Sequence, residues 1–269
     1  MKYQFGFIGT GNMGGALATA VCKRIGPQDV LLSDKAISKA DKLADTLGCT
    51  ASDVLTVVES CRYIFLGVKP QMMAELFEEI RPVLQKRENR FLLVTMAAGL
   101  SMDVIAGLGG GNLPVIRIMP NTPVSVGEGM ILYSANPLVT EEEMEVFTEA
   151  LSFAGKLDRI DEEKIDAASV ISSCGPAFMF MFMKAMADAG VALGLSLEKS
   201  QLYAEQAMLG SAALALTTGE SPEELKIKVC SPGGTTIEGV KSFEKNEFDK
   251  IVSEAAIASY RRTLELAGK

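Results

Sequence analysis

The sequence contains no histidine and no tryptophan. Without an imidazole, the chain has neither the base of a histidine-dependent hydrolase nor a histidine ligand for a catalytic zinc ion. The cysteines are scattered, odd in number and never spaced as Cys-x-x-Cys: they are Cys22, Cys49, Cys61, Cys174 and Cys230. This pattern is typical of reduced thiols in the cytoplasm rather than of a disulfide framework or a metal site. We therefore expect a cytoplasmic protein that binds no metal.

Positive charge is also scarce. There are 26 Lys and Arg residues against 34 Asp and Glu, which gives a formal net charge of −8 at pH 7. Nucleic acids and anionic membrane surfaces both require clustered basic residues. The longest apolar stretch, residues 176–183, is far shorter than a membrane span, and we expect no signal peptide. The sequence therefore predicts neither a nucleic-acid nor a membrane partner.

Short apolar runs alternate with helical patterns in the first half of the chain. Apolar strands separated by helices predict an α/β fold with a doubly wound, mainly parallel sheet. The predicted strands are residues 4–9, 30–33, 63–68, 91–96, 115–119, 130–133 and 156–160. The strand at 130–133 follows its predecessor after only a turn, so we expect it to run antiparallel at an edge of the sheet.

The second half is predicted to be helical. Thr140 and Glu143 have the spacing of a capping box, and Ser221 precedes a proline and two glutamates, a strong helix start. We predict two domains, residues 1–158 built on the sheet and residues 159–269 built from helices.

One helix, predicted to begin at Gly175, is apolar on every side because residues 178–183 alternate Phe and Met. Such a helix must be buried all round. A helical domain of this size can hardly surround it alone, so we expect a second copy of the chain to complete the core. A monomer that buries the helix against its first domain is the alternative.

A glycine-rich turn follows the first predicted strand. Gly9, Gly11 and Gly14 form the pattern G-x-G-x-x-G between an apolar strand and a helix. The first glycine permits a tight turn, the second lets the backbone approach a pyrophosphate, and the third lets helix and strand pack closely. Amide groups at the helix N-terminus then face the phosphates. The pattern predicts a bound dinucleotide, and a glycine-rich turn without a ligand is the alternative.

The second predicted strand ends at Ser33, followed by Asp34 and Lys35. Asp34 lies about 20 residues after Gly14, where an acidic side chain usually binds the ribose 2′-hydroxyl of NAD. Ser33, Lys35 and Lys39 can instead donate to the 2′-phosphate of NADP. NADH and NADPH therefore both remain open, as does a simple turn role for Asp34.

Further motifs follow along the chain. They are Val68-Lys69-Pro70, Ala97-Ala98-Gly99, Met119-Pro120-Asn121-Thr122-Pro123, Gly175-Pro176-Ala177 and Ser231-Pro232-Gly233-Gly234-Thr235-Thr236. They occur in the order found in pyrroline-5-carboxylate reductases, and the sequence resembles that family. The resemblance implies a Rossmann-like domain followed by an all-helical dimerisation domain, NADPH or NADH as hydride donor, and L-proline as product. It also implies a homo-oligomer built on a dimer through the helical domain. Many members of the family carry Ser or Thr where this chain has Asp34.

The glycine pattern and the resemblance together define the candidate site residues. The cofactor-binding candidates are Ile8, Gly9, Gly11, Asn12, Met13, Gly14, Ser33, Asp34, Lys35, Val68, Lys69, Pro70, Ala97, Ala98 and Asn121. The candidates for binding the substrate carboxylate are Ser231, Gly233, Gly234, Thr235 and Thr236. Lys69 and Asn121 have simpler alternatives, as a solvated loop lysine and a turn-stabilising asparagine. Ser172, Ser173 and Gly175 are expected either to cap the helix after them or to contact substrate.

Hydride transfer to a cyclic imine needs little acid catalysis, because a protonated imine is already an electrophile. A chain without histidine suits this reaction better than ketone reduction. Successive amides in 233–236 can bind a carboxylate, and the hydroxyl of Thr236 is the predicted catalytic donor to the ring nitrogen. Helix capping is the alternative role of Thr236.

Two other functions fit the same architecture. A β-hydroxyacid dehydrogenase would need a catalytic lysine on a core helix, for which Lys184 is the candidate. A non-catalytic sensor of NAD(P) would bind the cofactor without oxidising it in the presence of an imino acid.

Overall fold

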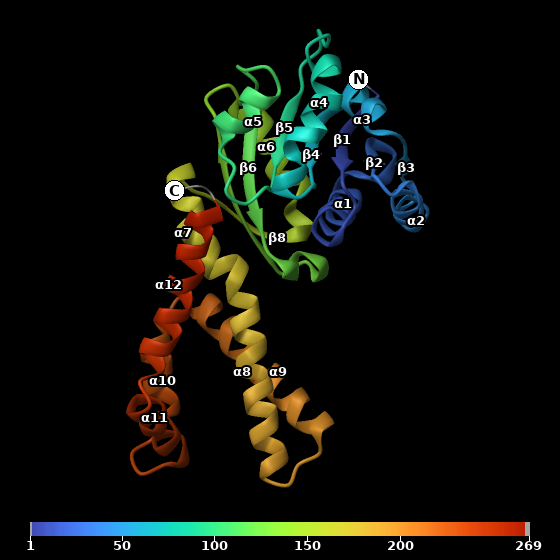
Figure 1. The fold of residues 1–269 in the computed structure, drawn as a ribbon. Helices are drawn as coiled ribbons and strands as arrows, with labels where there is room; N and C mark the ends of the chain where they lie inside the picture. Colours follow the sequence, from blue (N-terminus) through green and yellow to red (C-terminus); the bar gives the residue numbers. More distant parts are fainter. Residues whose placement is uncertain (1, 267–269) are drawn as a thin grey trace. The chain divides into compact units, whose positions relative to one another are not determined.

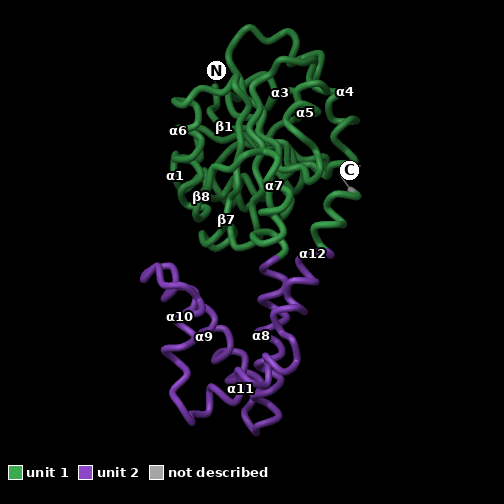
Figure 2. Tube along the Cα trace, turned by 90° about the vertical axis from the view of Figure 1, so that its left-hand side faces the viewer, with its two compact units in different colours: residues 1–174, 259–269 green, residues 175–258 purple. Residues whose placement is uncertain are grey.

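The computed structural model describes residues 2–266 and forms two compact units (Figure 2). Residues 1–174 and 259–269 make up the first unit, and residues 175–258 the second. The predicted domain boundary after residue 158 stays a prediction. In the structure, helix α7 (Glu162–Ser169) packs Ile165 against Met119 and Leu132 of the sheet, so this segment belongs to the first unit.

The described residues of the first unit contain an eight-stranded sheet of order β3-β2-β1-β4-β5-β6-β7-β8 (Figure 1). The strands are β1 (Tyr3–Ile8), β2 (Val30–Ser33), β3 (Thr50–Ala51), β4 (Cys61–Leu66), β5 (Leu92–Thr95), β6 (Val115–Pro120), β7 (Gly129–Ala135) and β8 (Gly155–Arg159). Every adjacent pair is parallel except β6 with β7, which confirms the predicted mainly parallel sheet and the antiparallel direction of β7. Strand β8 is parallel to β7, so it also runs opposite to the other six strands. The edge position predicted for β7 was wrong, because β8 pairs with its free side.

Helices cover both faces of this sheet. They are α1 (Asn12–Ile25), α2 (Ile37–Leu47), α3 (Val54–Ser60), α4 (Met73–Leu84), α5 (Met102–Leu108), α6 (Glu141–Ala150) and α7. Apolar residues of α1, α2 and α6 share one buried cluster with Phe5 and Phe7 of β1, and those of α3, α4 and α5 share another with Ile64 of β4. The alternation of side chains along each strand divides the core into these two layers. The arrangement is the doubly wound α/β fold predicted from the sequence.

The strand order reverses beside β1. From β1 the chain winds outward through β2 and β3, and then returns to β4 on the other side of β1. The amide of Gly9 donates to Ser33 O at 2.8 Å, and the amide of Gly67 donates to Ile8 O at 2.7 Å. The carboxyl ends of β2, β1 and β4 are therefore held together at the reversal, which is where doubly wound folds bind ligands.

The second unit is helical. It contains α8 (Gly175–Ala192), α9 (Leu197–Thr218), α10 (Pro222–Val229), α11 (Thr235–Lys245) and the first part of α12 (Phe248–Leu266). Phe182 of α8, Phe243 of α11 and Phe248 of α12 form a cluster with ring centroids 5.0–6.3 Å apart. Ser221 and Glu224 form the predicted capping box of α10.

Much of the apolar surface of α8 is not covered by the part of the chain that the structure describes. Met181 is 72% exposed and Phe180 is 61% exposed, although α8 packs along α9. The helical run 162–192 is long and apolar enough to cross a membrane by length and composition alone, a result that the sequence analysis did not anticipate. One such helix is weak support for a membrane span, because an apolar surface that a protein partner covers passes the same test.

A buried carboxylate ties α6 to β4 and to the segment that precedes β5. Glu143 is 3% exposed and accepts hydrogen bonds from Nε and Nη2 of Arg90, both at 2.8 Å, and from Nη2 of Arg62 at 3.2 Å. It also closes the predicted capping box by accepting from the amide of Thr140. The hydrogen bonds from Arg90 contribute most to lowering the pKa of Glu143 to about 2 from its ordinary value of 4.5.

We expect Glu143→Gln to lower the free energy of unfolding at neutral pH by about 2 kcal/mol, since both arginines are partly screened by solvent. The native pKa lies below the unfolded value, so this stabilisation is complete above pH 4.5 and is lost as the pH falls toward 2. Urea unfolding midpoints measured across that window should fall with pH for the wild type and change less for the variant. Glu142→Gln is the matched control, because Glu142 is exposed. Equal pH dependence in Glu143→Gln and the wild type would contradict the prediction.

Candidate functional site

The three glycines of the turn after β1 each meet a different spatial demand. Gly9 has φ +98°, and a Cβ there would lie 2.7 Å from Gly67 O. A Cβ on Gly14 would lie 2.1 Å from Gly9 O, so only glycine lets α1 pack this closely on the turn. A Cβ on Gly11 would meet no atom within 4 Å. The space in front of Gly11 is therefore left open by the protein, as a pyrophosphate-binding turn requires.

Helix α1 begins directly behind this turn. Its N-cap is Gly11, which has no side chain to accept from the first-turn amides, and within residues 2–266 no other side chain is hydrogen-bonded there. The amides of Asn12, Met13 and Gly14 are left for an anion, and the helix dipole favours negative charge at this end. The structure thus places Asn12, Met13 and Gly14 as the predicted phosphate-binding turn requires, although they do not line the cavity described next.

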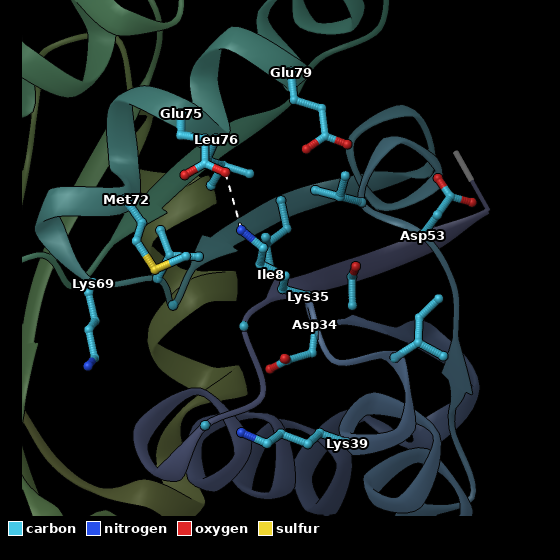
Figure 3. A pocket seen from close by; sticks show the side chains of 17 residues that line it. Ile8, Asp34, Lys35, Lys39, Asp53, Lys69, Met72, Glu75, Leu76 and Glu79 are labelled. Carbon is cyan, nitrogen blue, oxygen red and sulfur yellow. Dashed lines mark hydrogen bonds and ion pairs between the residues drawn. The ribbon is translucent and has the colours of Figure 1, made fainter.

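A cavity of about 500 Å³ opens at the reversal of the sheet (Figure 3). It is formed by residues that follow β1, β2 and β4, together with the first turns of α4. Eight of the predicted cofactor-binding residues line it, namely Ile8, Gly9, Gly11, Ser33, Asp34, Lys35, Val68 and Lys69. Their convergence supports the prediction that this is a dinucleotide site, and their individual roles stay predictions.

Asp34 is bound to the glycine-rich turn. Its Oδ2 accepts from the amide of Thr10 at 2.8 Å and from the Thr10 hydroxyl at 3.0 Å, and its Oδ1 accepts from the amide of Ala36 at 2.9 Å. Partial burial opposes ionisation of Asp34, but these hydrogen bonds and the charge of Lys39 outweigh it and lower the pKa. Asp34 is therefore an ionised side chain in a fixed position at the end of β2.

The other predicted cofactor residues follow the neighbouring strands. Ala97 and Ala98 follow β5, and Asn121 follows β6, at the same edge of the sheet as the cavity. The Ala97 side chain is buried in the core, whereas Ala98 is exposed. Pro70 begins a short 3₁₀ turn after Lys69 and does not line the cavity.

Both polar atoms of the Asn121 side chain are hydrogen-bonded within the first unit. Its Nδ2 donates to Ser172 O at 2.8 Å, and its Oδ1 accepts from the amide of Met130 at 2.8 Å. Pro176 lacks the amide hydrogen that would bind the Ser172 carbonyl in a regular helix, so Asn121 replaces it. These contacts match the turn-stabilising alternative for Asn121, and its predicted contact with the cofactor stays a prediction.

Ser172 and Ser173 do not cap a helix, so that alternative was wrong. They lie in a π-helical turn, Val170–Cys174, which connects α7 to α8 without a break in the helical run. The Ser172 hydroxyl donates to Ala168 O and the Ser173 hydroxyl to Pro120 O, the latter at 3.4 Å. π-Helical turns are frequent at functional sites.

The predicted substrate residues form a tight turn and helix start in the second unit. The amide of Gly234 donates to Ser231 O at 3.0 Å, and Gly233 has φ +71°, as the third residue of a type II turn requires. Helix α11 begins at Thr235 with Gly234 as N-cap. The capping alternative for Thr236 is therefore wrong, since Thr236 lies inside the first turn, exposed to solvent.

Several residues that line the cavity were not predicted from the sequence. They are Ile37, Asp53, Val54, Gly67, Met72, Glu75, Leu76 and Glu79. Gly67 had a signal in the sequence, because it is a glycine directly after an apolar strand. The structure gives the reason for it, since a Cβ there would lie 2.8 Å from Gly9 O. Asp53 also had one, as the N-cap of α3 that accepts from the amide of Thr56 at 2.9 Å. Nothing in the local pattern of α4 marks Glu75 and Glu79 as cavity residues.

Comparison with known proteins agrees with this geometry. A family model described as pyrroline-5-carboxylate reductase dimerisation matches residues 162–266, and one described as NADP oxidoreductase coenzyme F420-dependent matches residues 4–99. The chain is 36% identical to the pyrroline-5-carboxylate reductase of Escherichia coli over 99% of both chains. It superposes with a TM-score of 0.87 on the Plasmodium falciparum pyrroline carboxylate reductase with NADP bound, at 29% identity and full coverage of both chains. The Coxiella burnetii pyrroline-5-carboxylate reductase gives a TM-score of 0.89 at 28% identity, with 99% of both chains covered.

These matches run through both units, and the matched dimerisation segment contains the uncovered apolar helix α8. Three observations agree: the glycine-rich turn leaves open space before Gly11, a cavity lies at the sheet reversal, and sequence identity runs along the whole length. The chain belongs to the pyrroline-5-carboxylate reductase family.

Proposed function

We propose that this chain reduces 1-pyrroline-5-carboxylate to L-proline with NADPH or NADH as hydride donor, the last step of proline biosynthesis. The observation that carries the proposal is the 36% identity to a pyrroline-5-carboxylate reductase across 99% of both chains. The reaction needs a dinucleotide site and an anion-binding turn for the substrate carboxylate. The first unit supplies a cavity suited to the former, and the second a turn suited to the latter.

The residues present in the first unit fit a dinucleotide. The first-turn amides of α1 and the open space before Gly11 suit its pyrophosphate, and Asp34 suits a ribose at the end of β2. Lys69 follows β4 and is proposed to hydrogen-bond near the nicotinamide end. When bound, the cofactor supplies the hydride, so the protein has only to position the acceptor carbon and exclude water.

The substrate turn in the second unit suits a carboxylate. The amides of the first turn of α11 lack helical partners, and the left-handed conformation of Gly233 turns the preceding chain back toward them. We propose that these amides bind the carboxylate of the imino acid. The Thr236 hydroxyl then hydrogen-bonds the ring nitrogen, donating to the neutral imine and accepting from the protonated one. No strong acid is required, because a protonated ring nitrogen already activates the C=N bond.

The family model that matches residues 162–266 is described as a dimerisation model, and we further propose that this chain forms a homo-oligomer built on a dimer through the helical unit. The exposed Phe180 and Met181 of α8 would be buried by the second copy, in keeping with the dimerisation segment matched at 162–266. The cysteines are all free thiols, which suits a reducing compartment, so we propose a cytoplasmic location.

The test is consumption of NADPH or NADH on addition of 1-pyrroline-5-carboxylate to the purified protein, with L-proline identified as the product. A sensor would bind the nucleotide without consuming it. Absence of turnover, whether or not the nucleotide binds, would contradict the proposal. Lys184→Ala distinguishes imine reduction from the β-hydroxyacid dehydrogenase alternative, which needs Lys184 as its catalytic lysine. In the structure Lys184 is exposed and ion-paired with Asp188 at 2.6 Å. Imine reduction should persist in that variant, whereas a dehydrogenase would lose its activity.

We expect Thr236→Val to lower kcat about fivefold, since one neutral hydrogen bond to the reacting ring contributes roughly 1 kcal/mol. Thr236→Ser keeps the hydroxyl and should retain most of the activity. Steady-state kinetics of both variants check this, with cofactor affinity as the control because the turn lies outside the dinucleotide cavity. Wild-type turnover in Thr236→Val would remove Thr236 from the mechanism.

A further inference from the structure

Acidic side chains outnumber basic ones around the part of the cavity that follows β2. Asp34, Asp53, Glu75 and Glu79 line the cavity, against Lys35 and Lys39 on the same side, while Lys69 lies on the opposite side from Asp53 (Figure 3). The phosphate monoester of NADPH adds about −1.5 to −2 charges at neutral pH relative to NADH. The surroundings of this ribose-binding end therefore oppose the additional phosphate.

Asp34 has hydrogen-bonding capacity left for a hydroxyl but not for a phosphate. An ionised carboxylate offers about four acceptor positions. Thr10 occupies two on Oδ2 and Ala36 occupies one on Oδ1, which leaves one on Oδ1. A ribose 2′-hydroxyl can donate to it. A phosphate dianion carries no proton to donate, and the hydrogen bonds to Thr10 prevent the carboxylate from turning away.

The two lysines that could bind a 2′-phosphate already face carboxylates. Nζ of Lys35 lies 3.2 Å from Oε1 of Glu75, which reaches across the cavity from the first turn of α4 (Figure 3). Lys39 lies close enough to Asp34 for its charge to act on that carboxyl group. Both members of the Lys35–Glu75 pair are largely exposed, so the pair is weak and one substitution can release Lys35.

We propose that this chain prefers NADH to NADPH, and that Glu75 enforces the preference together with Asp34 by holding Lys35 away from a 2′-phosphate. The inference rests on the proposed function, because it concerns the same dinucleotide cavity. It makes Glu75, a residue on a helix distant in sequence from the glycine-rich turn, a determinant of cofactor specificity.

The test is the dissociation constant of NADH and of NADPH, measured by calorimetry on the full-length protein without substrate. The wild type should bind NADH at least about tenfold more tightly than NADPH, since one like-charge contact at short range is worth that much or more. Asp34→Asn keeps an acceptor for Thr10 and should shift the ratio toward NADPH by about tenfold. Glu75→Gln should shift it about threefold to tenfold, because it removes a charge and frees Lys35.

Two further variants separate a specific role of Glu75 from the general effect of removing one negative charge from the protein. Glu78→Gln removes the same charge from an exposed position on α4 outside the cavity and should leave the ratio unchanged. Adding Lys35→Met to Glu75→Gln should cancel most of the shift if the freed lysine binds the phosphate. A ratio that moves equally in Glu75→Gln and Glu78→Gln, or that is unchanged by Glu75→Gln, would overturn the role of Glu75.

The outcomes also separate this inference from the proposed function. Tighter binding of NADPH than of NADH by the wild type, with normal turnover of the imino acid, would overturn the inference alone. Binding of neither nucleotide would overturn both. Selective binding of NADH without turnover would support the inference and contradict the proposed reaction.

Discussion

Gly11→Ala is expected to leave the fold intact and to weaken dinucleotide binding about a hundredfold, by displacing the pyrophosphate from two or more amide donors. The backbone at Gly11 is extended, with φ −66° and ψ −170°, a conformation that any residue adopts. The added Cβ would meet no protein atom within 4 Å, so it occupies only the space that the ligand needs. Calorimetric titration with NADH and NADPH, beside a thermal unfolding curve, measures both effects.

Gly14→Ala provides the contrast within the same turn. Its Cβ would fall 2.1 Å from Gly9 O, so the helix or the turn must shift, and we expect a clearly lower unfolding temperature. Gly14→Ala should lose stability, whereas Gly11→Ala should lose only binding. This difference would separate the packing role of Gly14 from the ligand-binding role of Gly11. Unchanged affinity in a folded Gly11→Ala variant would mean that no pyrophosphate lies against this turn.

Asp166→Asn is expected to lower the free energy of unfolding by about 3 kcal/mol and the unfolding temperature by about 10 °C. Arg117 on β6 and Asp166 on α7 are 3% exposed, and Nη2 of the arginine lies 2.6 Å from Oδ1 of the aspartate. Glu162 is the second acidic neighbour, 3.6 Å from Nη1. Removing the Asp166 charge leaves the buried guanidinium with Glu162, at 3.6 Å, as its counter-charge among residues 2–266.

The control for this effect is an exposed ion pair on the same helix. Asp161 and Lys164 are paired at 2.9 Å and largely exposed, so Asp161→Asn should not measurably change the unfolding midpoint at the same protein concentration. The double variant Arg117→Met/Asp166→Leu should be more stable than Asp166→Asn, because it removes the buried guanidinium together with the carboxylate. A double variant that is the less stable of the two would contradict this account.

The first unit could be predicted from the sequence where local pattern and tertiary role agree. Gly9, Gly11 and Gly14 were recognisable because each has a distinct steric demand next to an apolar strand. The antiparallel direction of β7 followed from the shortness of its connection to β6. Strand β3 could not be predicted, since it has two residues, Thr50 and Ala51, and neither is fully buried.

The remaining features depend on contacts between segments distant in sequence. Glu75 reaches the cavity only because α4 packs beside β1 and β4, which no periodicity within α4 reveals. The continuous helix through Val170–Cys174 was hidden by Gly175 and Pro176, which usually interrupt helices. The helix continues because Asn121, about fifty residues earlier, donates from its side-chain Nδ2 to Ser172 O in place of the missing backbone amide.

The hydrogen bonds between Asp34 and Thr10 have a consequence for how fast the cofactor binds. They hold the turn after β1 in its binding shape in the free protein, so the ligand has no loop to order on arrival. No conformational entropy is lost at that turn, and association should proceed in one kinetic phase limited by diffusion and docking. Differences in affinity between nucleotides should then appear in the dissociation rate.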